Sequence, residues 1–150
     1  NNMLTQNTFI LQSNCATLDQ IIDHFECCTF SPPLIHIVSI NDYSKKLILF
    51  SHRYELWIGD KLIGLIAVYE NSPPEAYIPI VCVIDDYKGL GYGSKLLNYS
   101  LCEIERKGFK KVCLEVYNDN SIAFNMYLRY NFMPELVNDN KTLMCKYYDN

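Results

Sequence analysis

The strongest signal in the chain is the stretch Val81-Cys-Val-Ile-Asp-Asp-Tyr-Lys-Gly-Leu-Gly-Tyr-Gly-Ser-Lys-Leu-Leu97. Its first residues are apolar and β-branched, as in a strand, and its last residues have the apolar spacing of an amphipathic helix. Gly89, Gly91 and Gly93 separate the two at alternate positions. A glycine turn before a helix presents several backbone N–H groups together, and the helix dipole adds positive potential. The stretch therefore predicts a site for a phosphate or pyrophosphate.

Two familiar phosphate-binding patterns do not fit this turn. A P-loop needs Gly-x-x-x-x-Gly-Lys-Ser/Thr, an order that the segment Gly89-Leu-Gly-Tyr-Gly-Ser-Lys95 does not have. A dinucleotide fingerprint is Gly-x-Gly-x-x-Gly placed directly after a strand. Here the third glycine comes one residue early, and residues 85–88 separate the strand from the turn. An ordinary tight strand-to-helix turn that binds no ligand is also compatible with this spacing.

A third pattern fits better. The segment Lys88-Gly-Leu-Gly-Tyr-Gly93 resembles the Arg/Gln-x-x-Gly-x-Gly/Ala signature of the GNAT superfamily, the acyl-CoA-dependent N-acyltransferases. Lysine stands where arginine or glutamine is usual. It keeps a positive charge that can steer a phosphate, but it lacks the planar fork of arginine.

A second motif about thirty residues later resembles the same family. It is Leu114-Glu-Val-Tyr-Asn-Asp-Asn-Ser-Ile-Ala-Phe-Asn-Met-Tyr-Leu-Arg-Tyr-Asn-Phe132. Family members commonly show a strand, an Asn, an Ala three residues on, a Tyr seven residues beyond the Asn, and a closing Gly-Phe. The corresponding residues here are Asn120, Ala123, Tyr127 and Phe132, with Asn131 in place of the glycine. Asparagine tolerates left-handed backbone geometry next best after glycine.

The resemblance implies a set of cofactor-binding residues and a proton donor. Backbone N–H groups of the glycine turn would bind the pyrophosphate of acetyl-CoA, and N–H groups of the strand before it would bind pantetheine and polarise the thioester carbonyl. Tyr127 would protonate the leaving thiolate, although it could also be a core aromatic. The cofactor-binding candidates are Val81, Val83, Lys88, Gly89, Leu90, Gly91, Tyr92, Gly93, Ser94 and Asn120.

The general base and the acceptor site are less constrained. Glu115 lies twelve residues before Tyr127, as in the GNAT enzymes that acetylate ribosomal-protein N-termini, but a solvated strand carboxylate would look the same. Glu70, Glu75, His52 or a water relay are alternatives. The family places its acceptor side on the first two helices and their connection. Phe30, His36 and Tyr43 are therefore candidates to line a neutral, partly aromatic acceptor wall.

Periodicity and turn residues predict one α+β domain over residues 1–150, in which residues 1–7 form a flexible terminus. Pro32 and Pro33 end the first helix. This order agrees with the GNAT layout, a central mixed, mostly antiparallel sheet flanked by helices, with splayed fourth and fifth strands that hold the acyl-CoA. Residues 17–52 would form the acceptor-side helices and 76–132 the acetyl-CoA-binding core. The expected strands are 8–12, 54–58, 62–69, 76–83, 111–116 and 142–147, the last able to pair with 135–137, and the expected helices are 18–28, 41–51, 91–107 and 121–130.

Composition limits the class of protein. The chain has 150 residues, of which 49% are hydrophobic, so it can bury a substantial core. Its formal net charge of −4 argues against nucleic acid as an obligate partner. No apolar run is long enough for a membrane span, and no signal peptide precedes the first expected helix. We therefore expect a cytoplasmic protein without a membrane partner, and a homodimer stays open.

The seven cysteines are expected to be reduced. They are Cys15, Cys27, Cys28, Cys82, Cys102, Cys113 and Cys145. Most lie in apolar runs, without Cys-x-x-Cys spacing or a nearby cluster of histidines, and this favours small buried side chains in a reducing compartment. The pattern predicts no metal site.

The resemblance to the GNAT superfamily implies an N-acetyltransferase that moves an acetyl group from acetyl-CoA to a primary amine by direct transfer in a ternary complex, and the composition is compatible with this. The amine could belong to an amino sugar, an amino acid, a small amine or a protein N-terminus. The alternative from another class is a non-catalytic, acyl-CoA-binding regulatory module on the same fold. A nicotinamide-dependent oxidoreductase is disfavoured because the glycine spacing is wrong.

Overall fold

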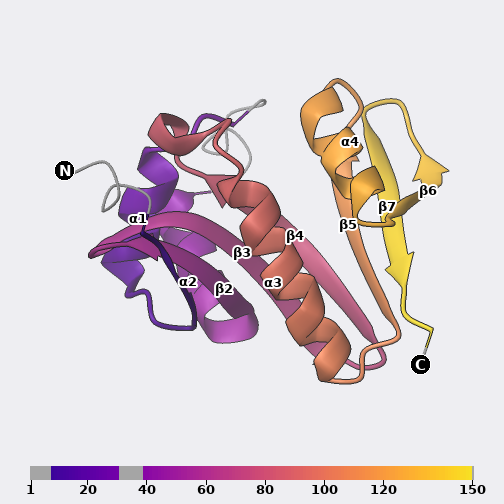
Figure 1. Ribbon diagram of the computed structural model, residues 1–150, viewed down its shortest axis with the longest axis horizontal. Helices are drawn as coiled ribbons and strands as arrows, with labels where there is room; N and C mark the ends of the chain where they lie inside the picture. Colours follow the sequence, from indigo (N-terminus) through magenta and orange to yellow (C-terminus); the bar gives the residue numbers. More distant parts are fainter. Residues whose placement is uncertain (1–7, 31–38, 150) are drawn as a thin grey trace.

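The computed structural model describes residues 8–30 and 39–149, which form a seven-stranded sheet with helices on both faces (Figure 1). Residues 1–7, the proline-containing break and His36 lie outside the described residues. A short 3₁₀ turn, Asp85–Tyr87, precedes the glycine turn. In chain order the other elements are β1 (Ile10–Ser13), α1 (Leu18–Glu26), α2 (Ile40–Phe50), β2 (His52–Ile58), β3 (Lys61–Ser72), β4 (Glu75–Val83), α3 (Tyr92–Arg106), β5 (Lys111–Tyr117), α4 (Ser121–Arg129), β6 (Met133–Val137) and β7 (Lys141–Tyr147).

The strand order is β1-β2-β3-β4-β5-β7-β6. All neighbours are antiparallel except β4 and β5, which are parallel because the chain crosses over through α3 between them. The expected mixed, mostly antiparallel α+β sheet is thereby confirmed. Every expected helix and strand within the described residues forms, with ends that shift by at most three residues.

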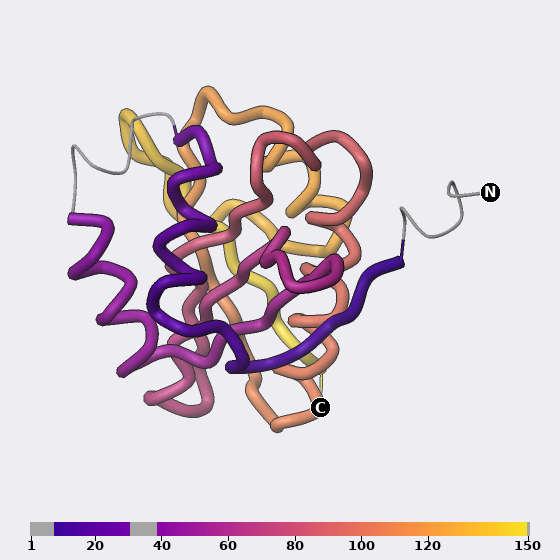
Figure 2. The backbone as a smooth tube through the Cα atoms, turned by 90° about the vertical axis from the view of Figure 1, so that its left-hand side faces the viewer, coloured from indigo at the N-terminus to yellow at the C-terminus, as the bar shows by residue number. Residues whose placement is uncertain are grey.

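Two apolar clusters fill the two faces of the sheet. Ile21 and Phe25 of α1 and Leu47 of α2 pack on one face. The other face carries α3, together with Tyr127 of α4 and Phe132. Figure 2 shows α1 and α2 on one side of the sheet and α3 on the other. Residues that alternate along a strand therefore belong to two different environments.

A bulge in β4 changes this alternation halfway along the strand. Tyr69 pairs with Tyr77 and Ala67 with Ile80, so β4 has one more residue than β3 between these two pairs. As a result Ile78 packs in the α3-side cluster, whereas Ile80 packs in the cluster under α1 and α2.

The bulge coincides with the end of pairing between β4 and β5. The parallel ladder runs from Glu75 opposite Lys111 to Ile78 opposite Leu114, and goes no further. Beyond this point the two strands diverge (Figure 1). The expected splay of the fourth and fifth strands is confirmed.

The helix ends follow from local sequence. Thr17 and Gln20 form a reciprocal capping box at α1, and Ser39 caps α2 through the amide of Asp42. Asn131 follows α4 with a φ of 70°, the left-handed conformation expected where the family motif has glycine. Among the described residues, no helix is both long and apolar enough to span a membrane.

The cysteines differ from the expectation of reduced, buried thiols. The structure joins Cys28 to Cys82 and Cys113 to Cys145 as disulfides. The second pair follows from register, because Cys113 of β5 lies directly opposite Cys145 of β7. The three remaining cysteines, Cys15, Cys27 and Cys102, are exposed. Sequence spacing could not show this, since both pairs join segments that only the fold brings together.

Candidate active site

The glycine turn leaves a row of N–H groups without partners. Gly89 and Gly91 have φ angles of 78° and 86°, and Gly91 is the N-cap of α3. The first amide of α3 to bond within the helix is that of Lys95, at 3.1 Å from the carbonyl oxygen of Gly91. The six N–H groups from Gly89 to Ser94 donate to no backbone or side-chain group that the structure describes. Consecutive free donors at a helix N-terminus suit an anion.

The side chains of the turn point elsewhere. Leu90 is 62% exposed, and Tyr92 is buried with its ring edge-on to those of Phe9 and Tyr87. Gly89 and Gly91 have no described atom within 4 Å of the place that a Cβ would occupy. The main-chain N–H groups of Leu90 and Tyr92 belong to the row of free donors, whereas the Tyr92 side chain packs in the core.

Lys88 is held by a neighbouring loop. Its Nζ lies 2.9 Å from Asp85 and 3.4 Å from the carbonyl oxygen of Thr29. Asp85 in turn accepts hydrogen bonds from the hydroxyl and amide of Thr29, at 2.6 and 3.0 Å. These hydrogen bonds, with those from Lys88, lower the pKa of Asp85 to about 2. The loop after α1 is therefore tied to the start of the glycine turn.

In the C-terminal half of β4, some main-chain N–H groups point toward the side where β5 diverges. The amide of Ile84 bonds the carbonyl oxygen of Ile63 on β3 at 3.0 Å. Since backbone groups alternate sides along an antiparallel strand, the N–H groups of Val81 and Val83 point away from β3. No β5 residue pairs with them, because that ladder ends at Ile78. Both predicted residues therefore border the divergence.

Helix α4 places Tyr127 on the α3 side of the sheet. The side chain is only 6% exposed, with its ring centroid 5.7 Å from that of Phe132. Burial raises the pKa of Tyr127 above its ordinary value. Asn120, predicted to bind the cofactor, is exposed and caps α4 by accepting from the amide of Ala123 at 3.3 Å.

Glu115 lies on the opposite face of the sheet from Tyr127. Its neighbours Leu114 and Val116 belong to the cluster that contains Tyr127, so alternation directs the exposed Glu115 toward the α1 and α2 side. There it accepts a 3.1 Å hydrogen bond from the hydroxyl of Tyr77. Burial, and then the charge of Glu115, raise the pKa of Tyr77.

Aromatic side chains line the same face. Tyr43 and Phe30 each pack on Phe25, with ring centroids at 6.0 and 6.2 Å. Tyr69 lies directly across the ladder from Tyr77. Neither Tyr69 nor Tyr77 is among the site residues predicted from the sequence. Both lie near the turn that joins β3 to β4, and strand pairing places them opposite each other.

The alternative bases have other partners. Glu70 is bonded to the ammonium of Lys107 at 2.9 Å and to the hydroxyl of Tyr54 at 3.0 Å. His52 lies 3.8 Å from Glu70 in the same group, and burial lowers its pKa. Glu75 is paired only loosely, 4.0 Å from Lys111.

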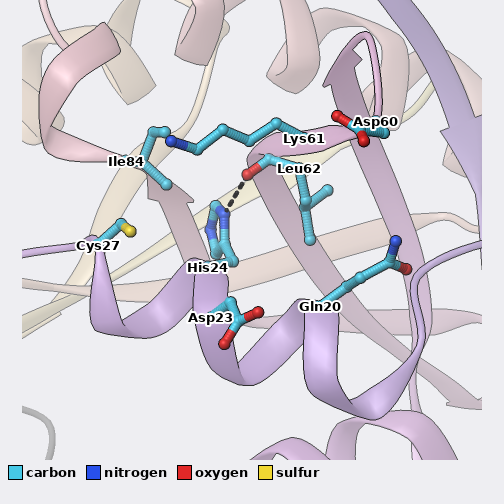
Figure 3. Close-up of a pocket in the computed structure, with 8 residues that line it drawn as sticks. All are labelled: Gln20, Asp23, His24, Cys27, Asp60, Lys61, Leu62 and Ile84. Atoms are coloured by element: carbon cyan, nitrogen blue, oxygen red, sulfur yellow. Dashed lines mark hydrogen bonds between the residues drawn. The ribbon is translucent and has the colours of Figure 1, made fainter.

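Two hollows lie outside this constellation. One, of about 170 Å³, lies between α1 and the start of β3 (Figure 3). Its lining residues are Gln20, Asp23, His24, Cys27, Asp60, Lys61, Leu62 and Ile84. The other, of about 400 Å³, lies at the C-terminal end of β5, and its lining residues are Tyr117, Asn118, Asp119, Asp139 and Asn140. Neither includes Tyr127 or the glycine turn, so the candidate active site is identified by its free donors and by the strand divergence.

Comparison with known proteins places this geometry in a family. Residues 18–132 match the model of the acetyltransferase (GNAT) family. Mycothiol acetyltransferase of Corynebacterium glutamicum (strain R) is 32% identical over 77 residues, 51% of this chain and 26% of that protein. N-alpha-acetyltransferase 30 of Schizosaccharomyces pombe is 29% identical over 78 residues, 49% of this chain and 52% of that protein. The chain thus spans about a quarter to a half of these relatives.

A solved structure shows the same fold. PaiA N-acetyltransferase from Thermoplasma acidophilum, in complex with coenzyme A, superposes with a TM-score of 0.75. The alignment covers 94% of this chain and 99% of that chain, at 17% identity.

Proposed function

Since the chain belongs to the acetyltransferase (GNAT) family, we propose that it transfers an acetyl group from acetyl-CoA to a primary amine within a ternary complex. The observation that carries this proposal is the row of free N–H groups from Gly89 to Ser94, set beside the divergence of β4 and β5. The first can hold a pyrophosphate, and the second leaves main-chain donors of β4 without a partner strand, which a pantetheine arm could pair with.

The cofactor would bind almost entirely through the main chain. The glycine-turn amides would hold the pyrophosphate, and the N–H groups of Val81 and Val83 would face the pantetheine and the thioester carbonyl. A donor aimed at the carbonyl oxygen stabilises the charge that develops there during attack. Lys88 would contribute less than an arginine, because Asp85 already compensates its charge at 2.9 Å.

Tyr127 would act as the proton donor to the leaving group. Attack of the amine nitrogen on the thioester carbon forms the new C–N bond, and the C–S bond then breaks to give a thiolate that needs a proton. The raised pKa of Tyr127 keeps its hydroxyl protonated at neutral pH. Burial also makes it a weaker acid, so donation is driven by the thiolate charge developing beside it.

Glu115 would receive the proton from the amine, directly or through a water. It lies on the α1 and α2 side, where an acceptor would enter, and Tyr127 lies on the other face of the sheet. A thioester passing between β4 and β5 would then meet the base on one side and the acid on the other. Phe30 and Tyr43 would form part of the acceptor wall.

The acceptor is proposed only as an amine that is a cation in solution. The exposed carboxylate of Glu115 attracts such a group, and the faces of Tyr43 and Tyr77 offer cation–π contacts. The names of the two relatives described above differ: one refers to mycothiol and the other to an α-nitrogen. Both classes, with amino sugars and small amines, therefore belong in the test.

Release of thiol from acetyl-CoA over a panel of amines tests the proposal. We expect turnover on one amine class and a loss of roughly 10²-fold in kcat for Tyr127→Phe, with little change in acetyl-CoA affinity. Tyr148→Phe is the matched control, since its hydroxyl bonds the carbonyl oxygen of Leu101 in the body of α3. Tight acetyl-CoA binding without turnover on any amine would instead support the regulatory module.

A further inference from the structure

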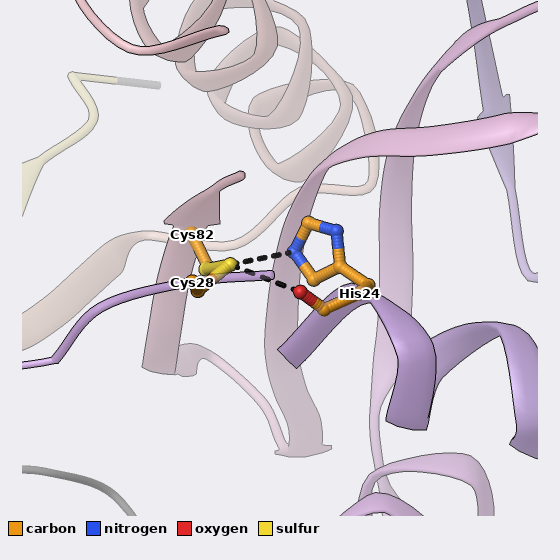
Figure 4. Close-up of side chains that lie close together, drawn as sticks. All are labelled: His24, Cys28 and Cys82. Carbon is orange, nitrogen blue, oxygen red and sulfur yellow. Dashed lines mark hydrogen bonds between the residues drawn. A yellow bond between two sulfur atoms is a disulfide. The ribbon is translucent and has the colours of Figure 1, made fainter. Parts of the chain in front are cut away.

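Three potential metal ligands meet where the end of α1 approaches β4 (Figure 4). His24 and Cys28 are four residues apart, one helical turn, and Cys82 comes from the C-terminal half of β4. The ligand atoms of the three all lie within 4.8 Å of one another, and Nε2 of His24 is 3.7 Å from the sulfur of Cys28. In the described part of the chain, this is the one such group of three.

The imidazole of His24 is oriented by a main-chain bond. Its Nδ1 lies 2.9 Å from the carbonyl oxygen of Leu62, which accepts only, so Nδ1 must carry the hydrogen (Figure 3). In this tautomer Nε2 carries a lone pair, and it lies 3.7 Å from the sulfur of Cys28. Histidines that bind metals usually have this arrangement, in which a carbonyl or carboxylate fixes the ring from behind.

Burial separates this group from ordinary surface clusters. His24 and Cys82 are 3% and 6% exposed, and Cys28 is half-buried. In the structure the two sulfurs form the Cys28–Cys82 disulfide, and reduction of that bond would leave two buried or half-buried thiols beside the imidazole. Here two sulfurs and a nitrogen, the preferred ligands of zinc, point at one small volume.

The backbone separation of the two cysteines also fits a shared ion. Their Cα atoms lie 7.1 Å apart, whereas disulfides usually span about 4.4–6.8 Å. Two thiolates on one tetrahedral zinc, each at about 2.3 Å from the metal, are about 3.8 Å apart and accommodate a wider backbone.

We propose that in the reduced protein Nε2 of His24 and the sulfurs of Cys28 and Cys82 bind one zinc-class divalent ion, with a water as fourth ligand. Binding converts both thiols to thiolates and releases two protons to solvent, with no change of oxidation state. The ion would fasten α1 to β4 between Val81 and Val83, the residues whose N–H groups face the strand divergence. Its role would therefore be to position the acceptor side against the cofactor strand.

Titration with Co²⁺, a spectroscopic probe for zinc sites, tests this on the whole chain, reduced and freed of metal. We expect thiolate-to-cobalt charge-transfer absorption that saturates at one ion per chain and is abolished by Zn²⁺. Cys28→Ser, at a half-buried position, should weaken Co²⁺ binding by roughly 10²-fold or more. Cys113→Ser removes a cysteine from the other pair and should leave the titration unchanged.

Cys82→Ser is not used as a test, because it changes a buried residue and can destabilise the fold by itself. A second readout therefore compares the thermal stability of wild type and Cys28→Ser. Zn²⁺ should raise the Tm of the reduced wild type and leave that of Cys28→Ser unchanged. Absence of charge-transfer absorption in reduced wild type, or equal cobalt binding by Cys28→Ser, would overturn the site. So would a Cys28–Cys82 disulfide that persists in intact-mass and peptide analysis under the reducing conditions of the titration.

Discussion

The hydroxyl of Tyr130 donates a 3.1 Å hydrogen bond to the main-chain carbonyl oxygen of Ser94. Ser94 belongs to the first turn of α3, and Tyr130 is the C-cap of α4. The helix that carries Tyr127 is thereby anchored to the helix end that presents the free amides. One hydrogen bond therefore connects the helix of the proposed proton donor to the proposed pyrophosphate site.

This link predicts a specific phenotype for Tyr130→Phe. Removing one hydrogen bond worth about 0.5–1.5 kcal/mol should loosen the first turn of α3. We expect KM for acetyl-CoA to rise by about 3- to 10-fold with kcat within about twofold of wild type. A fall in kcat as large as that expected for Tyr127→Phe would show that Tyr130 has a different role.

Gly91→Ala separates backbone strain from the approach of a ligand. Alanine at φ 86° costs about 1–2 kcal/mol of stability, and its Cβ would stand where the pyrophosphate is expected. Gly59→Ala, in the β2–β3 turn at φ 60°, is the control with similar strain. Urea denaturation should show similar losses of stability, whereas KM for acetyl-CoA should rise by roughly 10-fold or more only in Gly91→Ala. Equal KM values would remove the glycine turn from the cofactor site.

Glu115→Gln tests the base. If the carboxylate takes the amine proton, kcat should fall by about 10- to 10²-fold with acetyl-CoA affinity unchanged. Tyr77→Phe removes the 3.1 Å hydrogen bond but leaves the carboxylate, so its effect should be limited to the KM of the amine. Steady-state kinetics in both substrates checks this. A Glu115→Gln enzyme within twofold of wild type would favour a water relay.

The contact between Asp85 and Thr29 predicts a pH effect on stability. The pKa of Asp85 falls from 3.8 to about 2 on folding, so its contribution is fully present above pH 4 and is lost as the pH falls through 2. The difference in urea midpoint between wild type and Asp85→Asn should therefore be constant above pH 5 and shrink between pH 4 and 2. Asp86→Asn, at the exposed neighbouring position, is the control variant, because the hydrogen bonds from Thr29 go to Asp85. A difference that is independent of pH down to 2 would contradict the assignment.

Local features were predictable because they depend on residues close in sequence. The capping box at Thr17, the left-handed Asn131 and the strand–turn–helix around Gly91 each follow from a few neighbouring side chains. Matched spacing in two motifs also predicted which residues, Tyr127 among them, would belong to the site. Their roles stay predictions until kinetics tests them.

Other features needed the assembled sheet. Glu115 and Tyr127 have the family's spacing, but only the pairing of β5 with its neighbours assigns them to opposite faces. The hydrogen bond from Tyr77 to Glu115 joins residues 38 apart, and no local pattern indicates it. The expected absence of a metal site rested on spacing within the chain, where His24 and Cys28 had no visible third partner.

The amino-acid sequence by itself determined the order of helices and strands, the glycine turn at the start of α3 and the family, because propensity, capping and motif spacing act over one or two turns of chain. Only the tertiary structure decided where β4 and β5 part, which face each candidate side chain occupies, and that Cys82 meets Cys28 across 54 residues. These depend on a single extra residue in β4 and on strand register. A shift of one residue in either sends every following side chain to the other face of the sheet.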